Sequence, residues 1–118
     1  MPRIVGPTNV AVPLDINVSG MSPHVCAYRL WWRQANTDWQ VIAEGSTGDQ
    51  APDHVRHALA EGAQLAYWVG VAGNPNTSYQ AIITLGQEGK ALPNGLVGVE
   101  GQTNDAGVDV QEDWVSFV

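Results

Sequence analysis

The sequence predicts a single all-β domain over residues 1–118, built as an antiparallel β-sandwich of roughly eight or nine strands. Three observations lead to this fold class. Apolar and polar residues alternate over many short runs, the period of two that a half-buried strand requires. The chain contains 13 Gly and 7 Pro residues, which favour turns over long helices. Its 118 residues suffice for one hydrophobic core and are too few for two.

The N-terminal part should begin with an extended lead-in over residues 1–8, because Pro2 and Pro7 are incompatible with a helix interior. A first strand is predicted over residues 9–18. Pro13 lacks the N–H that a sheet ladder requires, so this strand should lie at an edge or break at Pro13. The apolar side chains that alternate along it are Val10, Val12, Leu14, Ile16 and Val18.

Two strands are predicted between residues 24 and 45, separated by a polar loop over residues 34–38. Side chains of the first strand alternate between the core and solvent. Trp39 begins the return strand. The predicted inward residues are Cys26, Tyr28, Leu30 and Trp32, and the predicted outward residues are Ala27, Arg29, Trp31 and Arg33.

Residues 46–62 support two interpretations, a short helix or a strand. A helix near residues 52–61 would carry a proline in its first turn and end at Gly62. We therefore expect at most one helix in the chain, near residues 52–61. The strand would instead turn these alternate side chains to one face: Val55, His57 and Leu59.

The second half of the chain is predicted to contain a hairpin over residues 65–85, with residues 73–76 supplying the turn between two alternating runs. A loop should follow over residues 86–95, with its tightest turn at residues 93–95. Roughly two or three closing strands are expected after this loop. Their apolar residues are Leu96, Val99, Val108, Val110, Trp114, Val115 and Phe117.

Composition and charge narrow the function classes. The acidic chain carries a formal net charge of −7 with 5 Lys and Arg residues, too few to track a phosphate backbone, so we expect no nucleic-acid partner. No apolar run reaches the length of about 18 residues that a membrane span needs, and no signal peptide is recognisable. Cys26 is the single cysteine, which excludes an intrachain disulfide and fits a cytoplasmic compartment, although secretion by another route stays open.

Enzymatic motifs are absent from the sequence: it contains no nucleophile elbow, phosphate-binding glycine loop or zinc-protease helix motif. His24 and Cys26 share a predicted strand face, but Cys26 alternates with core residues, so we expect an inert buried thiol. The sequence therefore predicts a protein that is not an enzyme and that needs no cofactor.

Two clusters raise metal hypotheses. His54 and His57 would meet one ion from a helical turn, with Asp53 or His24 as a third ligand, and the alternative is solvated loop side chains. An acidic turn offers oxygen donors for calcium but lacks the dense spacing that this ion favours, so a solvated turn is the alternative. Its donors are Asn104, Asp105, Asp109, Glu112 and Asp113. We predict no metal site at either cluster.

The motif Tyr28-x-Leu30-x-Trp32-Arg33, followed by a short loop and Trp39, resembles the third strand of fibronectin type III domains, an immunoglobulin-like sandwich family. A later segment resembles the penultimate strand of the same family and the turn that precedes it. The resemblance implies that these two strands are neighbours in one sheet. The residues of the later segment are Leu59, Gly62, Tyr67, Val69 and Val71.

A second resemblance is to the fungal immunomodulatory proteins, small fibronectin-like sandwiches that bind sugars and dimerise. It implies a carbohydrate ligand and self-association, although their amphipathic N-terminal dimer helix has no counterpart in residues 1–20. The matching residues are Tyr67, Val69, Val71, Gly73, Asn74, Ser78, Tyr79, Thr103, Asn104, Val108 and Val110.

The predicted ligand-binding site lies on the outward face of the two neighbouring strands, where Trp31 and Trp68 would be exposed with Arg29 and Arg33 beside them. Indole rings with nearby hydrogen-bonding groups suit sugars, and the same residue types anchor protein interfaces. The sequence therefore predicts a lectin-like, carbohydrate-binding module. The alternative is a self-assembling structural protein, a homo-oligomer that uses the same surface. A third interpretation buries one of these tryptophans under a loop or under residues 86–118.

Overall fold

The computed structural model describes residues 3–20, 25–34, 36–46 and 53–118, and within these ranges the chain forms nine strands and no helix. The described part of the chain accordingly has no helix that could cross a membrane. The strands are β1 (Arg3–Val5), β2 (Leu14–Gly20), β3 (Val25–Arg33), β4 (Gln40–Ser46), β5 (Asp53–His57), β6 (Gln64–Ala72), β7 (Ser78–Gln87), β8 (Lys90–Gln102) and β9 (Val108–Phe117).

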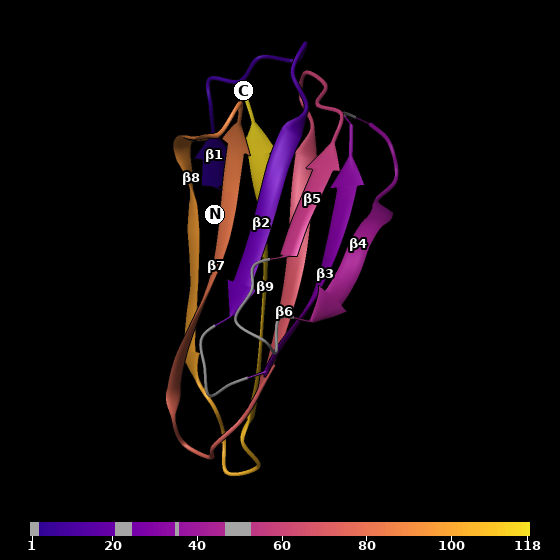
Figure 1. Ribbon diagram of the computed structural model, residues 1–118. Helices are drawn as coiled ribbons and strands as arrows, with labels where there is room; N and C mark the ends of the chain where they lie inside the picture. Colours follow the sequence, from indigo (N-terminus) through magenta and orange to yellow (C-terminus); the bar gives the residue numbers. More distant parts are fainter. Residues whose placement is uncertain (1–2, 21–24, 35, 47–52) are drawn as a thin grey trace.

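The strands form two sheets that pack face to face as two layers (Figure 1). One sheet has five strands in the order β1-β9-β6-β3-β4, and the other has four strands in the order β5-β2-β7-β8. The all-β class is thereby confirmed, and β3 pairs with β6 as expected. The prediction of a purely antiparallel sandwich is wrong at one edge, because β1 lies parallel to β9 and completes its backbone ladder there.

The core lies between the two sheets and is filled by alternate residues of the long strands. The alternation predicted for β3 and β6 is confirmed over the described side chains, and that for the first predicted strand is confirmed from Leu14 onward. Before Leu14 the prediction is wrong, because no strand forms over residues 9–13 and Val10 is 53% exposed. Trp32 shows the packing: its ring centroid lies 5.5 Å from that of Phe117 and 4.6 Å from that of His57. The buried set of these three strands is Leu14, Ile16, Val18, Tyr28, Leu30, Trp32, Leu65, Tyr67, Val69 and Val71.

β2 begins directly after Pro13, in agreement with a predicted break at a residue that cannot donate to a ladder. In the preceding turn the Val12 N–H donates to the Asn9 carbonyl over 3.1 Å. Along its outer edge β2 pairs with β5, so of the two interpretations of residues 46–62 the strand is correct over Asp53–His57 and the short helix is wrong. The strand is favoured because it pairs with the backbone N–H and C=O groups along one edge of β2 and packs Val55 against the core.

β6 and β7 do not form the hairpin predicted over residues 65–85, because they belong to different sheets. β6 lies between β3 and β9, so neither of its edges is free for β7. The connecting loop bonds instead to the β8–β9 loop, where the Thr77 N–H donates to Thr103 Oγ1 over 2.9 Å and the Gly73 N–H donates to the Gly107 carbonyl over 2.8 Å. Turn residues alone do not distinguish a reversal within one sheet from a crossing between two.

The hairpin is formed by β7 and β8, which turn at Glu88 and Gly89. Both turn residues have positive φ, 53° and 78°, as in the type I′ turns that match the twist of paired strands. The predicted loop over residues 86–95 is therefore wrong, and residues 93–95 lie within β8. Glutamate is not a typical residue for positive φ, which is why the sequence pattern misses this turn.

One hydrogen bond ties the two sheets together near the β6–β7 loop. The Tyr79 hydroxyl on β7 donates to Asp109 Oδ2 on β9 over 2.7 Å, and this bond holds the pKa of Asp109 below its usual value. A carboxyl whose folded-state pKa is lowered contributes stability above its unfolded pKa of about 3.9 and loses that contribution as the pH falls through the folded value.

Tyr79→Phe is expected to lower the free energy of unfolding by about 1–2 kcal/mol at neutral pH, because it removes a hydrogen bond to a charged acceptor. The difference from the wild type should narrow below about pH 4, which urea denaturation at about pH 7 and about pH 3 measures. In an Asp109→Asn background the same change should cost equal amounts at both pH values. If Tyr79→Phe lowers the free energy of unfolding by as much at about pH 3 as at about pH 7, this role of Asp109 is contradicted.

Candidate functional site

Four of the five tryptophans gather on the outward side of the five-stranded sheet, which we call the tryptophan face. Trp31 belongs to β3, Trp68 to β6 and Trp114 to β9, while Trp39 lies just before β4. All four are partly exposed. Trp32 is the exception, because it follows Trp31 along the strand and therefore points into the core.

Strand register sets large and small side chains in rows across this sheet. Trp31 on β3 pairs with Ala66 on β6, which pairs in turn with Trp114 on β9. The two indoles therefore start from strands that lie two spacings apart, about 10 Å. A methyl group between two indoles leaves a hollow above it.

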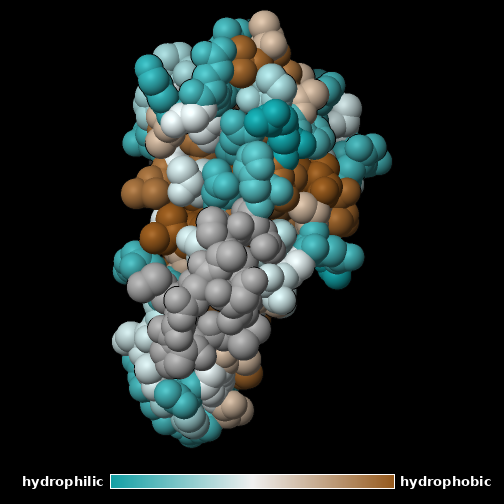
Figure 2. All heavy atoms as spheres, viewed as in Figure 1, coloured by the Kyte–Doolittle hydropathy of each residue, from teal (hydrophilic) through white to brown (hydrophobic). Residues whose placement is uncertain are grey.

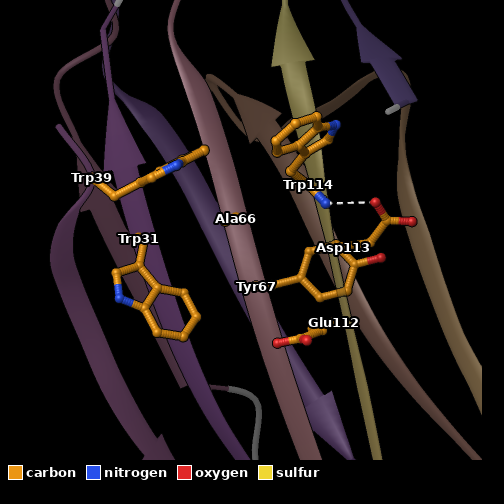
Figure 3. Close-up of a pocket in the computed structure, with 7 residues that line it drawn as sticks. All are labelled: Trp31, Trp39, Ala66, Tyr67, Glu112, Asp113 and Trp114. Atoms are coloured by element: carbon orange, nitrogen blue, oxygen red, sulfur yellow. Dashed lines mark hydrogen bonds between the residues drawn. The ribbon is translucent and has the colours of Figure 1, made fainter. Parts of the chain in front are cut away.

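This first hollow has a volume of about 460 Å³. In the view of Figure 3, Trp39 and Trp114 lie above Ala66, and Trp31 and Glu112 lie below it. Trp31 turns the broad side of its ring toward the viewer, whereas Trp39 is seen edge-on (Figure 3). The first hollow is therefore bounded largely by indole rings. Its other lining residues are Tyr67 and Asp113.

The polar groups of the first hollow are mainly oxygen acceptors. Glu112 is exposed, and Asp113 Oδ1 accepts the backbone N–H of Trp114 over 2.8 Å, the dashed line in Figure 3. Burial raises the pKa of Tyr67, and the negative charge of Asp113 adds to this effect, so the phenol stays protonated at neutral pH. Carboxylate oxygens beside aromatic walls can accept hydrogen bonds from a ligand that carries hydroxyl groups.

Arg33 braces one wall of the first hollow. Its guanidinium carbon lies 4.4 Å from the ring centroid of Trp39 and 5.9 Å from that of Trp114, and these two rings stack at 6.3 Å. Its Nε donates to Gln64 Oε1 over 2.6 Å, and Gln64 Nε2 donates to Ser116 Oγ over 3.0 Å. Because two indoles and an amide engage Arg33, it acts as a support for Trp39 and Trp114.

A second hollow, also of about 460 Å³, adjoins the first, and Trp31 lines both. Trp68 lines the second hollow, with its ring resting over Gly70, where any Cβ would collide with the ring. Arg29 pairs with Trp68 in the ladder, and its guanidinium carbon lies 5.9 Å from the Trp31 ring centroid. Its Nε donates to Glu44 Oε2 over 2.9 Å. The remaining lining residues are Ala27, Tyr28 and Gly45.

The structure brings three of the four predicted binding residues to the second hollow: Trp31, Trp68 and Arg29. Both tryptophans are half-buried, so neither is sealed under a loop or under residues 86–118. Arg33 lines neither hollow and lies instead behind the wall of the first. That these residues bind a ligand stays a prediction, since geometry alone does not test it.

Six residues that line the first hollow are absent from the predicted binding site: Trp39, Ala66, Tyr67, Glu112, Asp113 and Trp114. Alternation along β9 carries a signal for two of them, because Val115 and Phe117 face the core and thereby turn Glu112 and Trp114 outward. Trp39 carries no comparable signal. The β3–β4 ladder shifts register between Leu30 and Trp31, which changes the face to which the residues at the start of β4 turn, and the sequence pattern does not reveal this shift.

The opposite side of the molecule, the outer face of the four-stranded sheet, carries a polar hollow of about 390 Å³. Figure 2 shows hydrophilic residues gathered on this face in front of β2 and β5. Asp15 Oδ1 accepts a hydrogen bond from Arg56 Nε over 2.9 Å and lies 3.1 Å from His54 Nε2. The Arg56 bond holds the pKa of Asp15 below its usual value. Because Asp15, His54 and Arg56 bond to one another, they are poorly placed to recognise a ligand.

The histidine metal hypothesis depended on a helical turn that does not form. His54 bonds to Asp15 on the outer face of β5, whereas His57 packs against Trp32 on the inner face, so the two imidazoles point apart. Across the described ranges no group of three or more His, Cys, Asp or Glu side chains is placed to hold a metal ion.

The acidic turn before β9 is organised by its own hydrogen bonds. Asn104 Oδ1 accepts the backbone N–H groups of Ala106 and Val108 over 2.9 and 3.1 Å, and Asp109 accepts the Tyr79 hydroxyl described above. The side-chain oxygens of Asn104 and Asp109 therefore stabilise the fold. Outside the described residues lie His24 and the side chains of Cys26 and Asp53, on which the thiol and third-ligand hypotheses depended.

No protein-family model matches this chain, and no curated protein or solved structure matches it either. The geometry and chemistry of the tryptophan face are therefore the basis for assigning a function. Its two adjoining hollows, walled by indoles and edged by carboxylates, form the candidate functional site.

Proposed function

We propose that this protein is a non-enzymatic, lectin-like module that binds carbohydrate on the tryptophan face. The first hollow carries the proposal, because Ala66 separates the indoles of Trp31 and Trp114 and Glu112 lines the same space. Sugar rings present flat patches of C–H groups that stack on the negative faces of aromatic rings, and their hydroxyl groups require hydrogen-bonding partners. The first hollow offers both kinds of contact in one place.

Charge favours a neutral sugar over an anionic one. The chain carries a net charge of −7, and both arginines of the tryptophan face are engaged, Arg29 by Glu44 and Arg33 by Trp39. A carboxylated or sulfated sugar in the first hollow would meet Glu112 with no unengaged cation on the described part of this face. We therefore assign the ligand to the neutral carbohydrates.

The two carboxylates of the first hollow support binding without catalysis. Glu112 and Asp113 are consecutive residues of β9, so their side chains leave the strand on opposite faces. Glycoside hydrolysis requires two carboxyl groups that flank one bond from either side. The alternation of β9 places this pair unfavourably for that chemistry.

A glycan array followed by isothermal titration tests the proposal. Wild-type protein is expected to bind neutral glycans, and Trp31→Ala should weaken binding about tenfold or more, because this ring lines both hollows. The free energy of unfolding should change by less than about 1 kcal/mol, since Trp31 points outward. Leu96→Ala, an exposed apolar residue on the other sheet, is the matched control and should bind normally. An array on which no glycan is bound would overturn the proposal.

A second candidate function is self-association through the same face. Exposed apolar side chains near the hollows favour it, since Val41, Val108 and Val110 are 53%, 44% and 51% exposed. Among the described strands, β4 has a neighbour on one side only, so it forms an edge of its sheet. Size-exclusion chromatography with light scattering separates the two functions. An oligomer that dissociates in Trp31→Ala, together with a blank glycan array, would establish assembly as the role of this face.

We also infer that the sandwich is of the immunoglobulin-like type that includes fibronectin type III domains. In support, the order β4-β3-β6-β9 corresponds to strands C′-C-F-G of that type, and the neighbours β5 and β2 correspond to E and B. The β7–β8 hairpin is then an insertion between β6 and β9, the strands that correspond to F and G. The similarity to fungal immunomodulatory proteins agrees with a sugar ligand. An experimental structure in which β7 pairs with β6 would contradict this inference.

A further inference from the structure

The two hollows of the tryptophan face share Trp31, and we infer from this that the site takes a chain of sugar rings, with rings bound on either side of Trp31. This inference rests on the proposed function and specifies its ligand as a neutral, β-1,4-linked oligosaccharide of gluco configuration. A ligand that follows the surface from one hollow to the next must pass along the Trp31 ring.

The spacing of the hollows exceeds what one ring can fill. Ala66 lines the first hollow between Trp31 and Trp114, and Arg29 and Trp68 line the second. Two residues along a strand cover about 7 Å, and neighbouring strands lie about 5 Å apart, so Ala66 in the first hollow is on the order of 10 Å from Arg29 in the second. Each hollow, at about 460 Å³, is within the usual size of a ligand pocket. Together they form a path long enough for several linked rings.

The orientation of the indoles selects the shape of the sugar. Trp31 turns its broad side outward (Figure 3), and the Trp68 ring lies down over Gly70. A ring with only equatorial substituents keeps its axial C–H groups free on both faces and can lie flat on such indoles. An axial hydroxyl would interrupt that contact and lose its hydration against the indole. Equatorially linked, gluco-configured chains fit this surface best.

Polar partners are present at both ends of the path, which is what a chain of hydroxylated rings requires. Glu112 lines the first hollow. The ion pair of Arg29 and Glu44 lines the second; it is neutral as a whole, and the N–H groups of Arg29 other than Nε and the carboxylate of Glu44 provide donors and acceptors for hydroxyl groups. Hydrogen bonding at two separate ends means that the full affinity is reached only by a ligand that spans both.

The test is isothermal titration with two series of defined oligomers, β-1,4-linked glucose and β-1,4-linked N-acetylglucosamine, each from one ring to six. In at least one series the affinity should rise about tenfold or more between one ring and four and then level off. Trp114→Ala removes a ring that lines only the first hollow, and Trp68→Ala removes one that lines only the second. Each substitution should weaken binding of the longest oligomer about tenfold. Binding of a single ring at the hollow that keeps its tryptophan should stay nearly unchanged.

The outcomes separate this inference from the proposed function. Equal affinity for every chain length, or length dependence that survives both Trp114→Ala and Trp68→Ala, would overturn the two-hollow site while carbohydrate binding stands. Binding on the glycan array to sugars outside both series would overturn the assigned configuration. An array that binds nothing would remove the proposed function itself. Unfolding midpoints of each variant, measured alongside, show that any loss comes from the site and not from the fold.

Discussion

Replacing Ala66 with leucine is expected to weaken binding of the tightest neutral glycan about thirtyfold or more, a loss of about 2 kcal/mol. The larger side chain would occupy the space between Trp31 and Trp114 without removing any aromatic ring. Because Ala66 points outward from a strand, where larger residues are favoured, the free energy of unfolding should stay within about 0.5 kcal/mol. Titration with the glycan and urea denaturation measure the two effects.

Ala72→Leu provides the matched control for this substitution. Ala72 lies on the same strand and the same outward face as Ala66, but it lines neither hollow. Binding by Ala72→Leu should equal that of the wild type. If Ala66→Leu also binds normally, the ligand lies elsewhere on the protein, whatever glycan the array identifies.

Leu30→Ala is expected to lower the free energy of unfolding by about 3 kcal/mol, the largest effect on stability that we predict. Leu30 is fully buried on β3, between Ala43 of β4 and Tyr67 of β6, so truncation leaves a cavity that the flanking strands cannot close. The melting temperature should fall by roughly 10 °C. Thermal and urea unfolding, followed by near-ultraviolet circular dichroism, measure the change.

The same truncation at an exposed leucine controls for the loss of side-chain volume. Leu96 is 61% exposed on β8, so Leu96→Ala should change the free energy of unfolding by less than about 0.5 kcal/mol. Equal losses at the two positions would mean that the inward side of β3 does not face the core, and the division of this strand into core and binding faces would fail.

The strands that the sequence predicts correctly are those in which one face is buried along its whole length. In β3 and β6 the apolar residues at alternate positions leave one choice for the inward face, because a slip of one residue would expose all of them. Trp31 and Trp68 are consequently found on the outward side. In β5 the segment is too short for either period to dominate, and the need of β2 for a ladder partner decides its conformation.

The connections between strands are less predictable, because turn residues report a change of direction but not its destination. Residues 74–76 carry strong turn signals and lead β7 into the opposite sheet, while Glu88 carries a weak signal and forms the tight hairpin. The same limit applies to the site. Ala66 matters only because β9 lies beside β6, and this pairing joins residues far apart in the sequence.

β9 lies between β1 and β6, so strands from the two ends of residues 3–118 meet inside one sheet. In any state in which β9 is detached, β1 and β6 have open edges that invite pairing with other chains. Phe117 bonds through its N–H to the Ala63 carbonyl over 3.0 Å, and the neighbouring Val118 N–H reaches the Val5 carbonyl over 3.0 Å. The five-stranded sheet is therefore completed by contacts between residues far apart in the sequence, which couples the folding of the two ends of residues 3–118.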